Sequence, residues 1–228
     1  MSLHFQRQLE KLKKMILTLG TLVEESVEGA LRAVTNRDTE LAQQLIANDE
    51  KIDLMEIDVE EECLHTLACY QPVAHDLRYL IAVLKINNDL ERMADLAVNI
   101  AEVAMLMAKE GDRTPPPFDM SEEVKMVREM VTLSLDALVN TDNKVAARVR
   151  AMDKEVDEVH RQMYRNVEQA VQREPEKAPL LIQYLSVSRN LERIADHATN
   201  VAEDVIYMTR GDVLRHEAAA EHADETFT

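Results

Sequence analysis

Glycine, tryptophan and aromatic residues are scarce in this chain of 228 residues. Glycine occurs four times, tryptophan is absent, and the aromatic residues make up 4%. Most all-β architectures need glycine-bearing hairpin turns, so this scarcity argues against them. It also excludes glycine-rich phosphate-binding loops, because no stretch matches GxGxxG or GxxxxGK(S/T). The composition therefore predicts an all-α protein of long helices, with a core of aliphatic residues and methionine.

Basic residues are also in short supply. The 26 Lys and Arg face 43 Asp and Glu, which gives a formal net charge of −17. Such a surface repels the phosphates of nucleic acids and anionic lipid headgroups, so we expect no nucleic-acid partner. The excess acid has an ordinary explanation in the solubility of a helical surface. Beyond that, it favours cations and proteins with basic patches as partners.

The chain has only two cysteines and no long apolar run. Cys63 and Cys69 are six residues apart, without CxxC or zinc-site spacing, and we interpret them as buried free thiols in a reducing compartment. The first seven residues begin an amphipathic pattern instead of a signal peptide. No apolar run approaches the roughly 20 residues that span a bilayer. We therefore predict a cytoplasmic protein.

Helical periodicity is broken most clearly near the midpoint, where Pro115, Pro116 and Pro117 follow one another. Shorter breaks predict six helices, with Asp38 and Asp142 as N-caps. The expected helices cover residues 3–35, 39–69, 73–109, 119–139, 143–173 and 178–210. The expected organisation is a first bundle at 1–110, a proline-rich linker at 111–118, a second bundle at 119–210 and a frayed acidic tail at 211–228.

The two groups of three helices are an internal repeat. Residues 90–102 read LERMADLAVNIAE and residues 191–203 read LERIADHATNVAE, with nine of thirteen positions identical at an offset of 101. At an offset of 104, Asp49 and Asp53 match Asp153 and Asp157. This duplication predicts two similar antiparallel three-helix bundles related by an approximate two-fold axis.

The repeated motif places acidic side chains on one side of the third and sixth helices. At 100° per residue, Asp95, Asn99 and Glu102 lie within about 80° of Glu91, opposite the apolar positions. The same stripe in the sixth helix contains Glu192, Asp196, Asn200 and Glu203. The simplest interpretation is a solvated face. However, further along this side of the third helix lie Leu77, Leu80, Ile81 and Leu84, so we expect another helix or a partner to cover it.

The second and fifth helices carry paired aspartates, Asp49/Asp53 and Asp153/Asp157, beside their apolar stripes. Several carboxylates that converge from two helices repel one another, and a bound cation removes that penalty. Hard oxygen ligands suit Mg, Mn, Ca or oxidised Fe. The spacing alone is common in acidic helices, so solvated pairs remain the alternative.

Histidine suggests a competing site of the ferritin-like di-iron class. Glu62-x-x-His65 and Asp157-x-x-His160 have the ligand spacing of di-iron carboxylate bundles. The two occur at non-equivalent places in the repeat, and the first and fourth helices supply no matching inward Glu pair. We therefore expect exposed or hydrogen-bonded histidines. No arrangement in the sequence indicates nucleophilic or acid–base catalysis, which predicts a protein that is not an enzyme.

The segment from Tyr70 to Arg78, YQPVAHDLR, together with the two LER-x-A-D-x-A-x-N-x-A-E segments, resembles the bacterial PhoU family over roughly residues 4–210. The resemblance implies a cytoplasmic, non-enzymatic protein of two three-helix bundles. It implies repression of the phosphate-starvation response and of phosphate uptake when phosphate is plentiful. The implied partners are the sensor kinase PhoR and the transporter ATPase PstB, and we also expect a homodimer. A purely structural helical adaptor remains the other alternative.

The resemblance also implies multinuclear metal clusters on (E/D)xxxD motifs, with Fe, Mn, Mg or Zn as candidate metals and no organic cofactor. Leu96 stands in the first repeat where the second has His197, so any role of that histidine is confined to the second bundle. The implied metal ligands are Asp49, Asp53, Glu91 and Asp95 in the first bundle, and Asp153, Asp157, Glu192 and Asp196 in the second.

Overall fold

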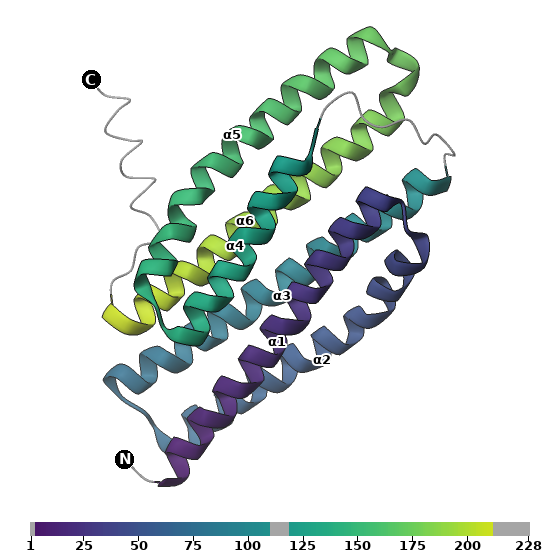
Figure 1. Ribbon diagram of the computed structural model, residues 1–228. Helices are drawn as coiled ribbons and strands as arrows, with labels where there is room; N and C mark the ends of the chain where they lie inside the picture. The colour runs from purple at the N-terminus through teal and green to yellow at the C-terminus, as the bar shows by residue number, and fades with distance from the viewer. Residues whose placement is uncertain (1–2, 110–118, 212–228) are drawn as a thin grey trace, which may run out of the picture.

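The computed structural model describes residues 3–109 and 119–211, and within these ranges it is helical with no strand (Figure 1). The predicted linker at 111–118 and the tail beyond residue 211 lie outside the described residues. The helices are α1 (Leu3–Asn36), α2 (Thr39–Tyr70), α3 (Ala74–Lys109), α4 (Ser121–Asn140), α5 (Asn143–Arg173) and α6 (Ala178–Arg210), with a short 3-10 helix η1 (Pro175–Lys177) before α6.

The helix limits agree with the predicted ones to within two residues, and both predicted N-caps are present. The Asp38 side chain accepts a hydrogen bond from the backbone N–H of Leu41. The Asp142 side chain accepts from the N–H groups of Lys144 and Val145. Each cap satisfies backbone donors that the first helical turn leaves free. The duplicated Asn-x-Asp sequence therefore starts α2 and α5 by the same local chemistry.

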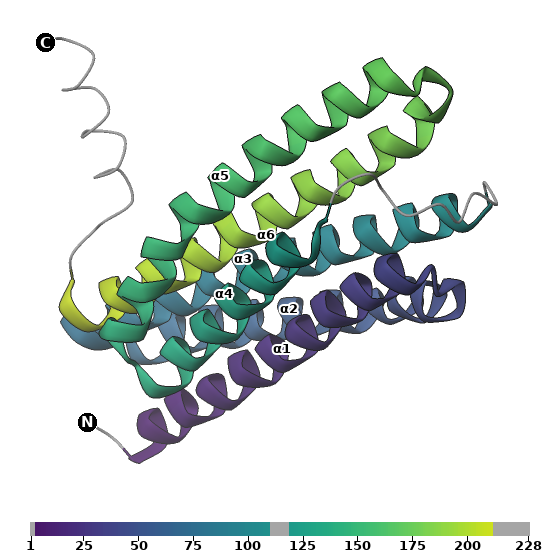
Figure 2. The ribbon, with the colours of Figure 1, turned by 45° about the horizontal axis from the view of Figure 1, so that its top comes forward.

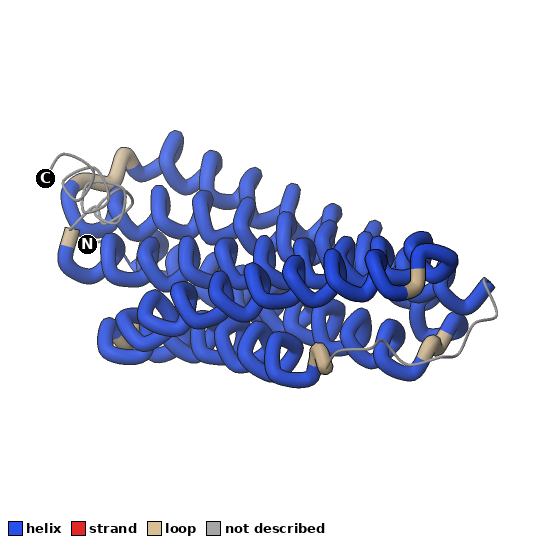
Figure 3. The backbone as a smooth tube through the Cα atoms, turned by 90° about the horizontal axis from the view of Figure 1, so that it is seen from above, coloured by secondary structure: helices blue, strands red, loops and turns tan. Residues whose placement is uncertain are grey.

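The six helices form two antiparallel three-helix bundles, α1–α3 and α4–α6, as the repeat predicts. The two bundles pack on each other mainly through α3 and α6, and α1 also contacts α4. Figures 1 and 2 show the two bundles side by side with α6 along α3, and Figure 3 shows helices connected by short loops. The central pair of helices is thus buried on two sides.

One apolar core runs through both bundles. It contains fully buried residues from both halves of the chain, including Leu12, Leu90, Met130 and Leu191. A smaller cluster around Met163 and Leu181 lies in the second bundle. The core is aliphatic and rich in methionine, as the composition predicts. Because the main core is continuous, the bundles stabilise each other.

The apolar side of α3 is partly covered within the chain by its neighbouring helices. Leu80 is fully buried, and Ile81 and Leu84 are half-buried. Leu77 stays 39% exposed in the single chain, so its cover by a partner remains a prediction. It lies in the first turn of α3, where α6 ends: the Arg78 side chain lies beside Gly211, which follows α6 directly. The cover that the chain itself gives to this side of α3 therefore begins at Leu80 and does not include Leu77.

The interpretation of both cysteines as buried is wrong for Cys69. Cys63 is fully buried, and burial raises the pKa of its thiol to about 12. Cys69 is exposed, with its sulfur 3.4 Å from Nε2 of His65. Six residues correspond to 600° of helical rotation, so the two side chains point about 120° apart. Only Cys63 faces the core.

Candidate metal centres

The paired acidic motifs of each bundle come from adjacent helices. In the first bundle, burial raises the pKa of Asp49, and the charges of Asp53 on α2 and Asp95 on α3 raise it further. Burial also raises the pKa of Glu91, followed by the charges of Asp95, Glu56 and Asp53. The carboxylates of α2 and α3 therefore repel one another across the helix pair. We call these four motif residues, Asp49, Asp53, Glu91 and Asp95, the first acidic cluster.

Arg92 partly neutralises the first acidic cluster. Its guanidinium lies 3.3 Å from Glu91 and 3.1 Å from Asp95, and it lowers the pKa of Glu91. Asp49 Oδ1 is buried with no hydrogen-bond partner among the described residues. A cation that reaches both helices must displace the guanidinium from Asp95. Among the described residues, the first cluster therefore offers no set of three converging ligands.

The second acidic cluster, Asp153, Asp157, Glu192 and Asp196, has the geometry of a metal site. One carboxylate oxygen from each of Asp157, Glu192 and Asp196 lies within 4.8 Å of the other two. Two oxygens that each lie about 2.4 Å from an ion are at most about 4.8 Å apart, so these three can share one cation. Arg193, the counterpart of Arg92, forms no ion pair within the described part of the chain.

Electrostatics in the second cluster also favour a cation. Loss of contact with water raises the pKa of Asp196 to about 7, and the charges of Glu192, Asp153 and Asp157 contribute. Asp196 keeps an exposed edge, so an ion has access from solvent. Burial raises the pKa of Asp153, and a hydrogen bond that Thr199 donates at 2.9 Å lowers it. The donors are all hard oxygens, which fits Mg, Mn or oxidised Fe better than Zn, whose sites usually include nitrogen or sulfur.

The sequence did not indicate Glu123, which lies in the first turn of α4. Such acids ordinarily face water beside the helix N-terminus, but Glu123 is fully buried. It accepts a hydrogen bond from Ser188 at 2.6 Å, and Ser188 also hydrogen-bonds His160 at 2.8 Å. Burial raises the pKa of Glu123 to about 7, opposed by the Ser188 bond and reinforced by the charge of Glu192. The negative region of the second bundle thus extends to α4.

The two motifs with di-iron spacing do not converge. His160 is bonded to Ser188, and His65 is exposed beside Cys69. Glu62 pairs with Lys11 of α1. The described residues therefore give no support to a ferritin-like centre.

His197 has a partner that the repeat by itself did not reveal. Its Nδ1 lies 2.9 Å from Asp89 on α3, and the Asn200 amide donates to the same oxygen at 3.1 Å. Asp89 is buried, and its repeat counterpart is Asn190, just as Leu96 is the counterpart of His197. Both members of this pair have thus diverged between the repeats. A second polar link, Lys85 to Asp204 at 3.3 Å, also joins α3 to α6.

No helix among the described residues is long and apolar enough to cross a membrane. The fold and the acidic clusters define a class of protein: a duplicated three-helix protein that carries (D/E)xxxD pairs on the second and third helices of each repeat. The chain belongs to the PhoU family, since the PhoU domain model matches it twice, over residues 16–104 and 120–205.

Relatives of known description match over nearly the whole chain. A phosphate-specific transport system accessory protein PhoU homolog from Aquifex aeolicus is 37% identical over 96% of this chain and 98% of its own. The Pseudomonas putida homolog is 36% identical over 94% of this chain and 84% of its own.

Solved structures agree with this membership. The crystal structure of PhoU from Pseudomonas aeruginosa has a TM-score of 0.88 at 36% identity, covering 91% of this chain and all of that one. The structure of the phosphate transport system regulatory protein PhoU from Streptococcus pneumoniae has a TM-score of 0.81 at 28% identity, covering 92% of this chain and 99% of that one.

Proposed function

We propose that this protein is a cytoplasmic accessory protein of a phosphate-specific transport system. In this proposal it restrains phosphate uptake and the phosphate-starvation response when phosphate is plentiful. The observation that carries the proposal is the match, over 94% or more of the chain, to relatives described as phosphate-specific transport system accessory proteins. Both repeats take part in the match, so the relationship concerns the whole molecule.

The proposed mechanism is protein–protein contact and not a chemical reaction. The partners would be the transporter ATPase PstB and the sensor kinase PhoR, with the protein acting as a homodimer. Long rigid helices offer extended faces for such contacts, and the net charge of −17 favours partners with basic surfaces. Because the core is continuous and α3 packs on α6, a partner that binds one bundle would also affect the other bundle.

A gene deletion tests this role. In the source bacterium, loss of the gene should switch on a phosphate-starvation reporter in phosphate-rich medium, and a plasmid copy should restore repression. Purified protein should bind the cytoplasmic part of PhoR and PstB in separate binding assays. A deletion strain that keeps normal repression and normal phosphate uptake would overturn the proposal.

We propose in addition that the second acidic cluster holds a metal ion, with Asp157, Glu192 and Asp196 as ligands and Asp153 beside them. This proposal is supported by the distances among the three oxygens. A bound cation would neutralise the carboxylates and link α5 to α6. The equivalent role of the first acidic cluster requires Arg92 to move away from Asp95.

A further inference from the structure

The outer face of α2 carries large apolar side chains that nothing in the described chain covers. Leu54 is 57% exposed, Ile57 is 48% exposed and Leu64 is 52% exposed. With Glu61 between them, these residues follow a spacing of three, four and three, which places them on one side of the helix. We call Leu54, Ile57, Glu61 and Leu64 the α2 outer face.

The repeat supplies an internal comparison for this face. At the offset of 104, the buried residues of α2 and α5 correspond: Val59 to Met163 and Cys63 to Val167. The two helices therefore present equivalent sides to their cores. The positions on α5 that match the α2 outer face are Glu158, Arg161, Arg165 and Glu168.

The α5 positions show what a solvated outer face looks like in this fold. All four residues are charged and exposed, and Glu158 forms ion pairs with Arg161 at 3.1 Å and with Arg165 at 3.0 Å. Since the same backbone position tolerates charge on α5, the fold does not require leucine or isoleucine there on α2. The apolar residues of α2 therefore point to contact with another molecule.

The charge of α2 indicates the chemistry of that molecule. The helix contains nine Asp and Glu but one Lys and no Arg, whereas α5 contains five Asp and Glu and seven Lys and Arg. A second copy that docked its own α2 here would bring the same negative charge, and an anionic membrane would be repelled as well. Charge complementarity favours an apolar surface flanked by lysine or arginine.

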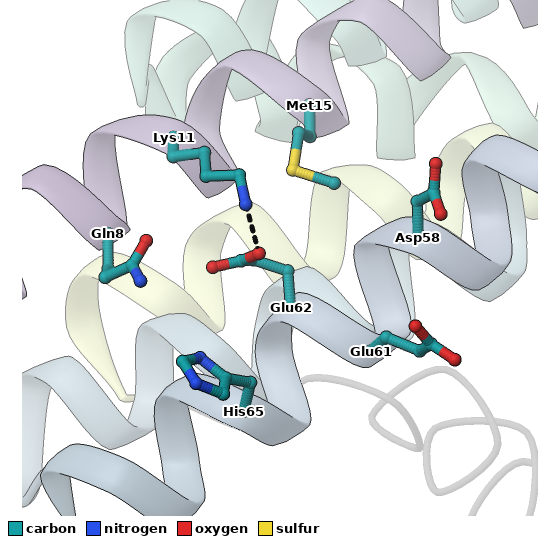
Figure 4. A pocket seen from close by; sticks show the side chains of 7 residues that line it. All are labelled: Gln8, Lys11, Met15, Asp58, Glu61, Glu62 and His65. Atoms are coloured by element: carbon teal, nitrogen blue, oxygen red, sulfur yellow. Dashed lines mark hydrogen bonds and ion pairs between the residues drawn. The ribbon is translucent and has the colours of Figure 1, made fainter.

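A groove between α1 and α2 opens beside this face (Figure 4). Its volume is about 610 Å³, and Asp58, Glu61, Glu62 and His65 line its α2 side. Lys11 reaches across from α1 to one oxygen of Glu62. The other oxygen, Oε1, is buried without a hydrogen-bond partner among the described residues. The exposed carboxylates of Asp58 and Glu61 are the open acceptors of the groove, which has room for a basic side chain next to the apolar residues.

We propose that the α2 outer face and this groove dock a basic amphipathic helix of a partner protein. The apolar side of that helix would cover Leu54, Ile57 and Leu64. A lysine or arginine at its edge would enter the groove toward the exposed carboxylates of Asp58 and Glu61. This is the helix-in-groove mode of recognition, with apolar anchors at helical spacing. The inference concerns a surface and a partner chemistry, and it stands whichever protein supplies the helix.

The test uses a variant that copies α5 onto α2: Leu54→Glu, Ile57→Arg and Leu64→Glu together. The probe is a fluorescently labelled Leu/Lys peptide of about 18 residues, with leucine at helical spacing. At about physiological salt, fluorescence anisotropy should show binding to the wild-type protein and a loss of affinity of roughly tenfold or more for the variant. The variant is more negative by one charge, so attraction by charge alone would leave its affinity equal or higher. Unchanged affinity would overturn the proposal.

Two controls separate the apolar face from other causes. The variant Glu158→Ser, Arg161→Ser and Glu168→Ser changes the equivalent face of α5 and should bind the peptide like wild type. A peptide of the same composition with scrambled order should bind the wild-type protein more weakly. Circular dichroism and thermal melting should show the fold intact in both variants, because all six substituted residues are exposed.

Sedimentation distinguishes a second copy from a foreign helix. The proposal expects wild type and the α2 variant to have the same oligomeric state. If the variant instead splits an oligomer that the wild type forms, the α2 outer face is a self-interface and the proposal is wrong. Failure here leaves the transport role untouched, because that role is tested by deletion and reporter expression, which need no peptide.

Discussion

At the scale of single residues, Arg92 and Arg193 distinguish two acidic clusters that the sequence makes nearly identical. Arg92 lies within 3.3 Å of both Glu91 and Asp95, whereas Asp157, Glu192 and Asp196 converge with no guanidinium paired to them in the described structure. The Arg92 side chain is 52% exposed, and such an ion pair contributes up to about 1 kcal/mol, which a cation that binds the first cluster must overcome. The two clusters should therefore differ in affinity for metal.

Metal analysis should show this difference. Replacing Asp157 and Asp196 together with Asn removes two of the three converging oxygens and should lower the metal content of protein purified without chelator. The matched pair Asp53→Asn and Asp95→Asn should lower it less. The cross-bundle pair, Asp95→Asn with Asp196→Asn, should lower the metal content by about as much as Asp196→Asn alone. If elemental mass spectrometry showed the same loss of metal for the two pairs of substitutions, the predicted difference in metal affinity between the clusters would be wrong.

Glu123 should make stability depend on pH. Its pKa is about 7 in the folded protein, against 4.5 as the ordinary value. Below pH 4.5 the group is protonated in both states. As the pH rises from 4.5 to 7 the unfolded chain releases the proton first, so the folded state loses stability, and above pH 7 the full penalty of about 3 kcal/mol applies. Glu123→Gln keeps an acceptor for Ser188 and removes the charge.

The Gln variant should thus be more stable than wild type at pH 8, by up to about 3 kcal/mol, and nearly equal near pH 4.5. Urea denaturation at the two pH values measures this difference. Glu122→Gln, at the exposed neighbouring position, is the matched control and should stay within about 0.5 kcal/mol of wild type at both. If Glu123→Gln has the same effect at both pH values, the carboxyl does not titrate in this range.

At the scale of elements, the beginning of each second helix depends on one aspartate. Asp142 accepts hydrogen bonds from two backbone amides of α5, and Asp38 accepts from one amide of α2. Asp142→Ala should cost about 1 kcal/mol in the free energy of unfolding, because it leaves those donors without an acceptor. Asp142→Asn retains a side-chain oxygen and should recover most of the loss. Urea denaturation of the three proteins tests the cap, and equal stability of wild type and Asp142→Ala would exclude it.

The elements themselves could be predicted from sequence because their determinants are local. Proline positions, N-cap residues and apolar spacing are properties of a few neighbouring residues, and they fixed the six helices to within two residues. The thirteen-residue repeat predicted that the three-helix bundle is duplicated. Helical rotation also separates exposed Cys69 from buried Cys63, but local information did not show that Glu123 is buried, since that depends on which helix lies opposite.

At the scale of the whole molecule, the two bundles are joined by polar contacts within the apolar α3–α6 seam. Asp89 accepts from both His197 and Asn200, and it is buried. Asp89→Ala should remove this shared acceptor from two donors and cost about 2 kcal/mol. The loss should appear as a lower urea midpoint and as faster amide hydrogen exchange along α3 and α6.

Asp89→Asn is the matched variant, since Asn is the residue that the repeat places at position 190. Its side-chain oxygen still accepts one hydrogen bond, so we expect an intermediate loss. If both variants matched wild type in stability and exchange, the polar contacts would add nothing to the apolar packing of the seam.

The sequence by itself determined the helices, their duplication, and the grouping of carboxylates on one side of each motif helix. Helical periodicity fixes the direction in which a side chain leaves its own axis, and that is a local property. It does not fix what lies in that direction. Only the tertiary structure decided that Leu80 is buried and that Arg92 pairs with one acidic cluster while no described guanidinium pairs with the other. It also decided that the side of α2 bearing Leu54, Ile57 and Leu64 faces no other helix of the described chain. These outcomes depend on contacts between residues far apart in the chain, which no local pattern records.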